Sequence, residues 1–231
     1  MNFGDLAYPD VPAGAVHLLP LGATEPHGPH APLSTDTLIS LGICNRAAER
    51  LDGEIEVLVL PAVPYGVTRY GSAFPGAVSI GEETLRSLVT EIAGSVGSLV
   101  LVNSHFEPEQ VETLRSTGLP LLDLTRRRNA ERLTDEFRSG SCHAGRYETS
   151  LVLADRPELV HADRMLALDE RHVDMPAAIG AGRTDFIAMG MDEAYCGAPA
   201  TLERRCLPTS WDTGSWDCPR GMLCASSSGL A

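Results

Sequence analysis

Short apolar runs alternate with longer amphipathic segments between residues 16 and 154. The apolar runs predict buried strands at 16–21, 55–63, 98–102 and 119–124, because they lack the polar alternation of a half-exposed strand. The amphipathic segments predict helices at 35–51, 80–96, 108–116, 128–139 and 147–154, and Thr35 or Asp36 is expected to cap the first. Apolar strands that alternate with helices predict an α/β fold, with a mostly parallel sheet flanked by helices on both faces.

The loops that follow these strands are the expected location of a functional site. In a parallel sheet of this kind, ligands bind beyond the carboxyl ends of the strands. We therefore expect the loops after the first three strands to converge. Those loops contain most of the histidines and acids discussed below.

The C-terminal part of the chain has a different character. After about Thr201 there is no periodicity, although both tryptophans and three of the six cysteines lie there. Two interpretations stay open, a frameshift that replaced an ordinary helix and a natural disordered extension. The break in composition favours the frameshift. We assign residues 1–200 to one domain and 201–231 to an irregular tail.

Composition excludes several classes of partner and mechanism. The chain has 231 residues and a net charge of −13, which argues against nucleic acids and anionic membranes as partners. All 18 basic residues are arginines, so no Schiff-base or P-loop lysine is available. The sequence shows no signal peptide and no apolar run that could span a membrane. With scattered cysteines and no CxxC pair, we expect a soluble cytoplasmic protein with reduced thiols.

The loop after the first predicted strand concentrates metal-ligating residue types. It contains Glu25, His27, His30 and Asp36. Glu25 and His27 are two apart, so in an extended chain they point to the same side. Imidazole and carboxylate ligands suit Zn, Mn or Fe(II). A solvated polar loop with incidental acids and histidines is the alternative that this cluster alone leaves open.

Two further clusters follow. His105 and Glu107 repeat the spacing of two directly after a buried strand, and Glu107 could instead serve a helix N-terminus. His143 and Glu148 lie in a later loop and helix, where both could be structural residues. Clusters on loops that are expected to converge are less easily explained by chance than any one of them.

Together the clusters offer two histidines and three acids as direct metal ligands: Glu25, His27, Asp36, His105 and Glu107. These are too many for one tetrahedral zinc ion. They fit two divalent metal ions bridged by one carboxylate and a water molecule. In such a site the bridging hydroxide attacks a carbonyl carbon, and His143 could carry a proton to the leaving nitrogen.

Five sequence motifs resemble those of the creatininase (creatinine amidohydrolase) family. They are PLGATEPHGPHAPLSTDT at 20–37, FPGAVSI at 74–80, NSHFEP at 103–108, HAGRYETS at 143–150 and YCGAPAT at 195–201. The resemblance implies a three-layer α/β sandwich. It also implies a metal-dependent amidohydrolase that acts on C–N bonds of small or cyclic amides. Members are commonly homo-oligomers, often hexamers.

The resemblance also implies roles for single residues. Glu25 and His105 would bind one metal ion, His27 and Glu107 the other, and Asp36 would bridge them. The ions would be Zn, Mn or Fe.

The remaining roles concern catalysis and substrate. His143 matches the family's substrate-side histidine and would act in catalysis, and Glu148 matches either a catalytic acid or an acid that supports a neighbouring site residue. Ser72 and Phe106 would contact the substrate together with His143.

The substrate stays open between several amides. Creatininase itself has tryptophans around its substrate, whereas the segment DEFRSGSC before His143 has none, and Phe106 replaces a tyrosine. Creatinine is therefore not the expected substrate. The alternatives are a formamide, as for the family's pyrimidine deformylase branch, a peptide, as for its mycofactocin-maturing peptidase branch, and a non-catalytic metal-binding remnant. A nucleophilic Cys142 is a weaker alternative, because adjacent loop residues such as Cys142 and His143 usually diverge.

Overall fold

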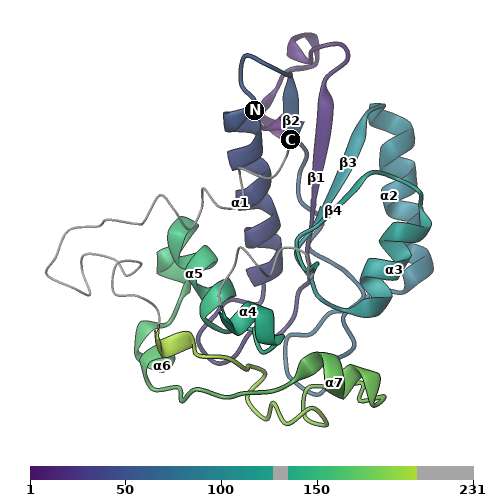
Figure 1. Ribbon diagram of the computed structural model, residues 1–231. Helices are drawn as coiled ribbons and strands as arrows, with labels where there is room; N and C mark the ends of the chain where they lie inside the picture. Colours follow the sequence, from purple (N-terminus) through teal and green to yellow (C-terminus); the bar gives the residue numbers. More distant parts are fainter. Residues whose placement is uncertain (127–134, 202–231) are drawn as a thin grey trace, which may run out of the picture. The chain divides into compact units, whose positions relative to one another are not determined.

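The structure is a computed structural model that describes residues 1–126 and 135–201 (Figure 1). The first part of the helix predicted at 128–139 and the tail after Thr201 lie outside the described residues. The chain forms two compact units, and neither is one continuous stretch of sequence. Unit 1 consists of Met1–Thr24, Asp36–Thr68 and Val78–Thr125. Unit 2 consists of Glu25–Thr35, Arg69–Ala77 and the residues from Arg126 onward.

A parallel four-stranded sheet forms the centre of unit 1. Its strands are β1 (Val16–Leu21), β2 (Val57–Val59), β3 (Leu99–Asn103) and β4 (Leu121–Asp123), in the order β2-β1-β3-β4. All three pairs are parallel, as predicted. β2 and β4 are shorter than the predicted runs. β2 ends shortly before Pro61, which has no N–H to donate to a neighbouring strand.

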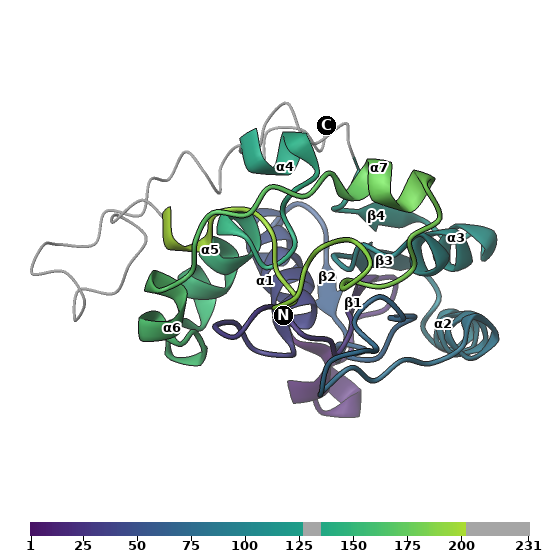
Figure 2. The same cartoon turned by 90° about the horizontal axis from the view of Figure 1, so that it is seen from below.

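Helices cover both faces of this sheet (Figures 1 and 2). On one face α1 (Thr35–Arg50) contributes Cys44 and Ala48 to a cluster with Leu18 of β1. On the other face α2 (Glu82–Val96) and α3 (Pro108–Ser116) pack against the sheet. Unit 1 therefore has the three layers of an α/β sandwich, and the predicted fold class is confirmed.

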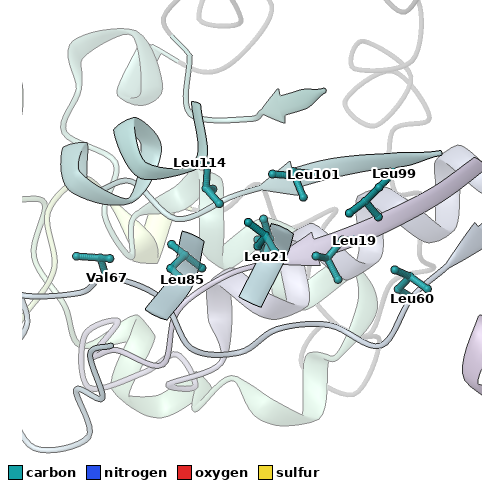
Figure 3. Packing of buried hydrophobic residues seen from close by; sticks show 9 residues of the cluster. Leu19, Leu21, Leu60, Val67, Leu85, Leu99, Leu101 and Leu114 are labelled. Atoms are coloured by element: carbon teal, nitrogen blue, oxygen red, sulfur yellow. The ribbon is translucent and has the colours of Figure 1, made fainter. Parts of the chain in front are cut away.

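The larger apolar core lies under α2 and α3 (Figure 3). Leu19 and Leu21 of β1 meet Leu85 of α2 and Leu114 of α3 there. Each is at most 1% exposed, and full burial of such a side chain contributes about 1.5–3 kcal/mol. Both faces of β1 are buried, which explains why its sequence shows no polar alternation.

Unit 2 contains short helices and connecting loops. The helices are α4 (Asp135–Ser139), α5 (Arg146–Asp155), α6 (Ala162–Leu166) and α7 (Met175–Gly180). Single 3₁₀ turns lie at Pro157–Leu159 and Pro199–Thr201, and unit 1 has two more at Phe3–Asp5 and Tyr8–Asp10. Of these helices, the sequence predicted α5 and also α4, which is the end of the helix expected at 128–139. It did not predict α6 or α7. No helix in the described part of the chain is long and apolar enough to cross a membrane.

Candidate functional site

In unit 1, the segment that follows β3 presents two candidate ligands on one side. The backbone is extended at Glu107, immediately before α3 begins at Pro108. His105 and Glu107 are buried, whereas Phe106 between them is 40% exposed. The spacing of two residues therefore has the predicted effect, because alternate side chains of an extended chain face opposite ways.

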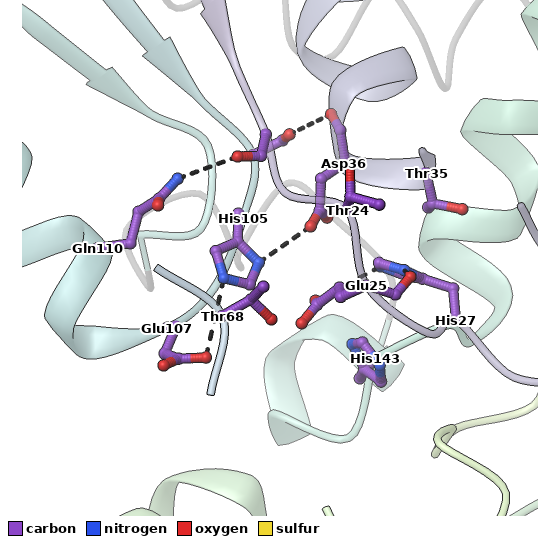
Figure 4. Close-up of polar contacts among 12 residues, drawn as sticks. Thr24, Glu25, His27, Thr35, Asp36, Thr68, His105, Glu107, Gln110 and His143 are labelled. Carbon is purple, nitrogen blue, oxygen red and sulfur yellow. Dashed lines mark hydrogen bonds and ion pairs between the residues drawn. The ribbon is translucent and has the colours of Figure 1, made fainter. Parts of the chain in front are cut away.

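His105 joins Asp36 from the first turn of α1 (Figure 4). Its Nδ1 lies 2.9 Å from Asp36 Oδ2. Its Nε2 lies 2.9 Å from the Val67 carbonyl oxygen and 3.9 Å from Glu107 Oε2. A carbonyl only accepts hydrogen bonds, so we assign the proton to Nε2. The Nδ1 atom then faces the Asp36 carboxylate, and a proton or a metal ion makes that contact favourable.

In unit 2, the loop after β1 builds a second group. His27 Nδ1 lies 3.2 Å from the carbonyl oxygen of Glu25. His27 Nε2 lies 4.0 Å from Glu25 Oε1 and 3.5 Å from Oε2 of Glu148, which is in the first turn of α5. His27 is fully buried and Glu25 is 2% exposed. The Glu25 carboxylate and the His27 ring are therefore held close together away from water.

His143 belongs to this second group. Its Nε2 lies 3.0 Å from the Pro26 carbonyl oxygen. Its ring lies between those of His27, with ring centres 4.6 Å apart, and Phe186, at 4.3 Å. One ligand atom each from Glu25, His27 and His143 lies within 4.8 Å of the others. His143 was expected to act on substrate, and its position would also allow it to bind a metal ion.

The three histidines share a feature that suits metal ligands. His27, His105 and His143 each direct one ring nitrogen at a main-chain carbonyl. In metal sites such a bond fixes the tautomer and leaves the other nitrogen to bind the metal. The neighbouring carboxylates are buried, and buried carboxylates require cationic or hydrogen-bonding partners. Each group therefore has the chemistry to hold a divalent cation such as Zn, Mn or Fe(II).

Glu148 also holds the loop that carries His143. Its Oε2 accepts a 2.7 Å hydrogen bond from the Ala144 N–H. Ala144 has a φ of 51°, a left-handed conformation that costs a non-glycine residue about 1 kcal/mol or more. Glu148 thus compensates for strain directly beside His143 while facing His27.

The two predicted substrate contacts lie outside these buried groups. Ser72 is exposed in a turn in which its N–H donates to the Arg69 carbonyl at 3.0 Å. Phe106 is 40% exposed, whereas its neighbours His105 and Glu107 are buried. Their roles in substrate binding stay predictions.

Cys142 is poorly suited to be a nucleophile. Burial, followed by the negative charge of Glu148, raises the pKa of its thiol well above the usual value. Thiolate, not thiol, is the reactive form. The two carboxylate–imidazole groups are the stronger candidates for catalysis.

Sequence reasoning missed three buried polar residues around these groups. His30 was noticed but given no role, and its Nε2 lies 2.9 Å from Thr149 Oγ1. Gln110 and Glu136 carried little signal in the sequence, because most of their partners are main-chain atoms distant in sequence. Polar residues within otherwise apolar helix faces were the only available clue.

The sheet of unit 1 and the two carboxylate–imidazole groups define an α/β protein with candidate metal-ligating groups. Comparison with known families then identifies it. The model of the creatininase family, described as creatinine amidohydrolase, matches residues 5–221, and the chain belongs to this family of amidohydrolases. The match continues past Thr201, where the sequence motifs end.

Curated relatives have two different activities. The mycofactocin precursor peptide peptidase of Mycobacterium ulcerans (strain Agy99) is 38% identical over 159 residues, 65% of this chain and 62% of that protein. The protein of the same name from Mycobacterium tuberculosis (strain H37Rv) is 32% identical over 194 residues, 80% of this chain and 75% of that protein. Creatinine amidohydrolase of Pseudomonas putida is 30% identical over 217 residues, 81% and 78% of the two chains. This chain thus spans less than two thirds of the M. ulcerans protein.

Solved structures agree with the fold. A crystal structure of creatinine amidohydrolase (creatininase) has a TM-score of 0.67 and 28% identity, over 89% of this chain and 90% of that one. A structure described as creatininase Mn has a TM-score of 0.63, 27% identity and the same coverage. The relation supports a three-layer α/β sandwich.

Proposed function

We propose that this protein hydrolyses an amide C–N bond with the help of two divalent metal ions. The observation that carries the proposal is the shared arrangement of the three buried histidines. Each has one nitrogen on a main-chain carbonyl and lies beside buried carboxylates. Such groups are costly to bury without a cation. Membership in a family of amidohydrolases supplies the reaction class.

The proposed ligands are the five residues that the resemblance implies: Glu25, His27, Asp36, His105 and Glu107. The pairing of Glu25 with His105, and of His27 with Glu107, on either side of a bridging Asp36 rests on the resemblance in sequence. Zn, Mn or Fe ions held by these residues would polarise the amide carbonyl and make a water molecule acidic enough to attack it.

His143 is the proposed proton carrier. Its Nε2–H is held by the Pro26 carbonyl, so Nδ1 is the nitrogen left to accept a proton and pass it to the leaving amine. Phe186 and His27 restrict the ring on its two sides. Glu148 fixes the neighbouring Ala144 peptide and thereby positions the His143 loop.

A small or cyclic amide is the first candidate substrate, and a peptide is the second. The peptide is favoured by the similarity to two mycofactocin precursor peptide peptidases at 38% and 32% identity. Ser72 and Phe106 remain the proposed substrate contacts. Assembly into a homo-oligomer is proposed on the resemblance alone.

The decisive experiment measures metal content and hydrolysis together. Protein purified without chelators is analysed by mass spectrometry and then reloaded with Zn²⁺ or Mn²⁺. It is incubated with creatinine, N-formyl amides and short peptides, and the products are identified by mass. We expect about two metal equivalents per chain and the addition of one water molecule across the C–N bond, which opens a cyclic amide or divides an open-chain amide into an acid and an amine. Products from peptides alone would favour the second candidate.

A pair of variants controls this experiment. Asp36→Asn keeps the shape of the side chain but removes its charge, and we expect it to lose metal and activity. Asp52→Asn makes the same change at an exposed position after α1 and should behave as wild type. A wild-type protein that binds neither metal would overturn the proposal and favour a non-catalytic remnant. Full activity in Asp36→Asn would overturn it as well.

A further inference from the structure

Gln110 is a fully buried amide on α3 that none of the proposed chemistry uses. Its exposed fraction is 0%. Its Oε1 accepts a 2.8 Å hydrogen bond from the Val67 N–H. Its Nε2 donates to Asn103 Oδ1 at 3.0 Å and to the Gly22 carbonyl at 3.3 Å. One side chain thus joins α3 to the ends of β1 and β3 and to the loop that contains Val67.

These bonds close a ring around His105. Gln110 donates to the Asn103 side chain, and Asn103 Nδ2 donates to the His105 carbonyl at 2.9 Å. The His105 ring in turn bonds the Val67 carbonyl, and the N–H of Val67 returns to Gln110. All four residues are at most 1% exposed. The ring therefore holds both the main chain and the imidazole of His105.

The loop approaches Gln110 so closely that a side chain would not fit. A Cβ atom added at Gly66 would lie 2.3 Å from Gln110 Oε1 and 2.7 Å from the Gly22 carbonyl oxygen. Glycine lets the main chain come this near. The peptide before Val67 is thus held between the amide of Gln110 and the end of β1.

We infer that Gln110 is a positioning residue for metal binding, acting on His105 through Val67 and Asn103. The inference rests on the proposed metal-dependent function. The bond from Nε2 to the Val67 carbonyl keeps the Nδ1 lone pair directed at Asp36. Without Gln110 the N–H of Val67 loses its acceptor, so the main chain is held less firmly at the residue whose carbonyl orients His105. The peptide that carries this carbonyl keeps one bond of its own, from the Thr68 N–H to Ser79 Oγ at 3.0 Å. Loss of the group that orients a metal-binding histidine typically changes metal affinity 10–100-fold, and Gln110 acts on such a group, the Val67 carbonyl, through the Val67 main chain.

The opposing explanation is that Gln110 only satisfies buried polar groups. Both explanations predict that Gln110→Met lowers the melting temperature, since it leaves the Val67 N–H and the Gly22 carbonyl without this partner. Only the positioning role predicts weaker metal binding by protein that is still folded. A control variant must therefore destabilise α3 without touching the ring. Val111→Ala does so at the next, buried position.

The experiment titrates the metal-free full chain with Zn²⁺ in competition with a chelator. We expect Gln110→Met to weaken at least one binding step by roughly 10–100-fold, and Val111→Ala to leave every step near wild type. Asn103→Ala should weaken the same step. The double variant with Asn103→Ala and Gln110→Met should bind Zn²⁺ little more weakly than either single variant, because both changes break the same ring of hydrogen bonds. Wild-type affinity in every step for folded Gln110→Met would overturn the inference.

A spectroscopic readout separates this inference from the proposed function. The tautomer of His105 is read from the ¹⁵N shifts of its ring in metal-free protein. We expect a protonated Nε2 on the Val67 carbonyl in wild type and Val111→Ala, whether or not Nδ1 also carries a proton beside Asp36, and a partly deprotonated Nε2 in Gln110→Met. If wild type binds no Zn²⁺ but the ¹⁵N shifts of His105 still differ between wild type and Gln110→Met, the proposed function fails and the orienting role of Gln110 stands. An unchanged tautomer in Gln110→Met refutes the role of Gln110 itself.

Discussion

The carboxylate of Glu136 holds unit 2 together around the His143 loop, and its removal should be strongly destabilising. It accepts hydrogen bonds from three main-chain N–H groups, those of Arg146 at 3.0 Å, Tyr147 at 3.1 Å and Ala198 at 2.7 Å. The side chain is 9% exposed. Gly197 leaves the necessary room, since a Cβ there would lie 2.4 Å from Glu136 Oε2.

The magnitude follows from these three bonds. A hydrogen bond to a charged group contributes about 1.5–3 kcal/mol, so Glu136→Ala could cost up to about 9 kcal/mol if nothing replaced the carboxylate. A cavity of about 450 Å³ borders Glu136, however, and admits water that would satisfy part of the loss. We therefore expect about 3–4 kcal/mol for Glu136→Ala. Glu136→Gln keeps one acceptor oxygen and should cost about 1–2 kcal/mol.

Urea unfolding followed by far-ultraviolet circular dichroism measures these differences. The matched control is Asp135→Ala, because the Asp135 side chain is 82% exposed and lies on the same short helix. It should change the free energy of unfolding by less than about 0.5 kcal/mol. A cost below about 1 kcal/mol for Glu136→Ala would refute the reasoning, since the three N–H groups would then not depend on the carboxylate.

Three further predictions concern the proposed site and the assembly. Thr149→Val should lower kcat by about tenfold or more, because the Thr149 hydroxyl links His30 to the Ala144 carbonyl beside His143. Thr149→Ser keeps the hydroxyl and should not lower kcat. Steady-state kinetics of the metal-loaded protein tests both variants. Burial, followed by repulsion from His27 and His143, lowers the pKa of His30 from 6.5 to about 4. Between these values the unfolded chain binds a proton that the folded chain does not, so stability falls as the pH drops, by up to about 3 kcal/mol. Urea titrations at several pH values should show that His30→Gln loses this slope, and an equal loss in the exposed His172→Gln would contradict the assignment. Light scattering on purified protein should give the mass of a hexamer, and a monomer at micromolar concentration would contradict the resemblance.

The fold of unit 1 was predictable because its signals are local. β1 and β3 are apolar on both faces, and the helices between strands have continuous apolar stripes. The burial of His105 and Glu107 on one side was predictable for the same reason, since a spacing of two residues in extended chain decides which side each faces. Their role as ligands stays a prediction. That alternation also places Phe106 on the opposite side, although the resemblance suggested a substrate contact.

Most of the helices and the apolar cluster of unit 2 could not be predicted from the sequence. Its helices α6 and α7 are too short to show a period, and its apolar cluster joins Tyr70 with residues such as Met175 and Phe186 far along the chain. Glu136 and Gln110 could not be recognised, because each bonds main-chain groups that any residue type would present. Such contacts exist only once the chain has folded.

The interleaved composition of the two units has a genetic consequence. The chain passes from one unit to the other at Thr24, Thr35, Thr68, Ala77 and Thr125, so each unit is assembled from separate stretches of the gene. No single cut in the coding sequence yields either unit intact. Glu25 and Asp36, although neighbours in one motif, fall on different sides of such a boundary. A crossover between relatives at the Thr35–Asp36 boundary would separate the candidate ligands Glu25 and His27 from Asp36, His105 and Glu107, but it would combine segments of two parents within each unit.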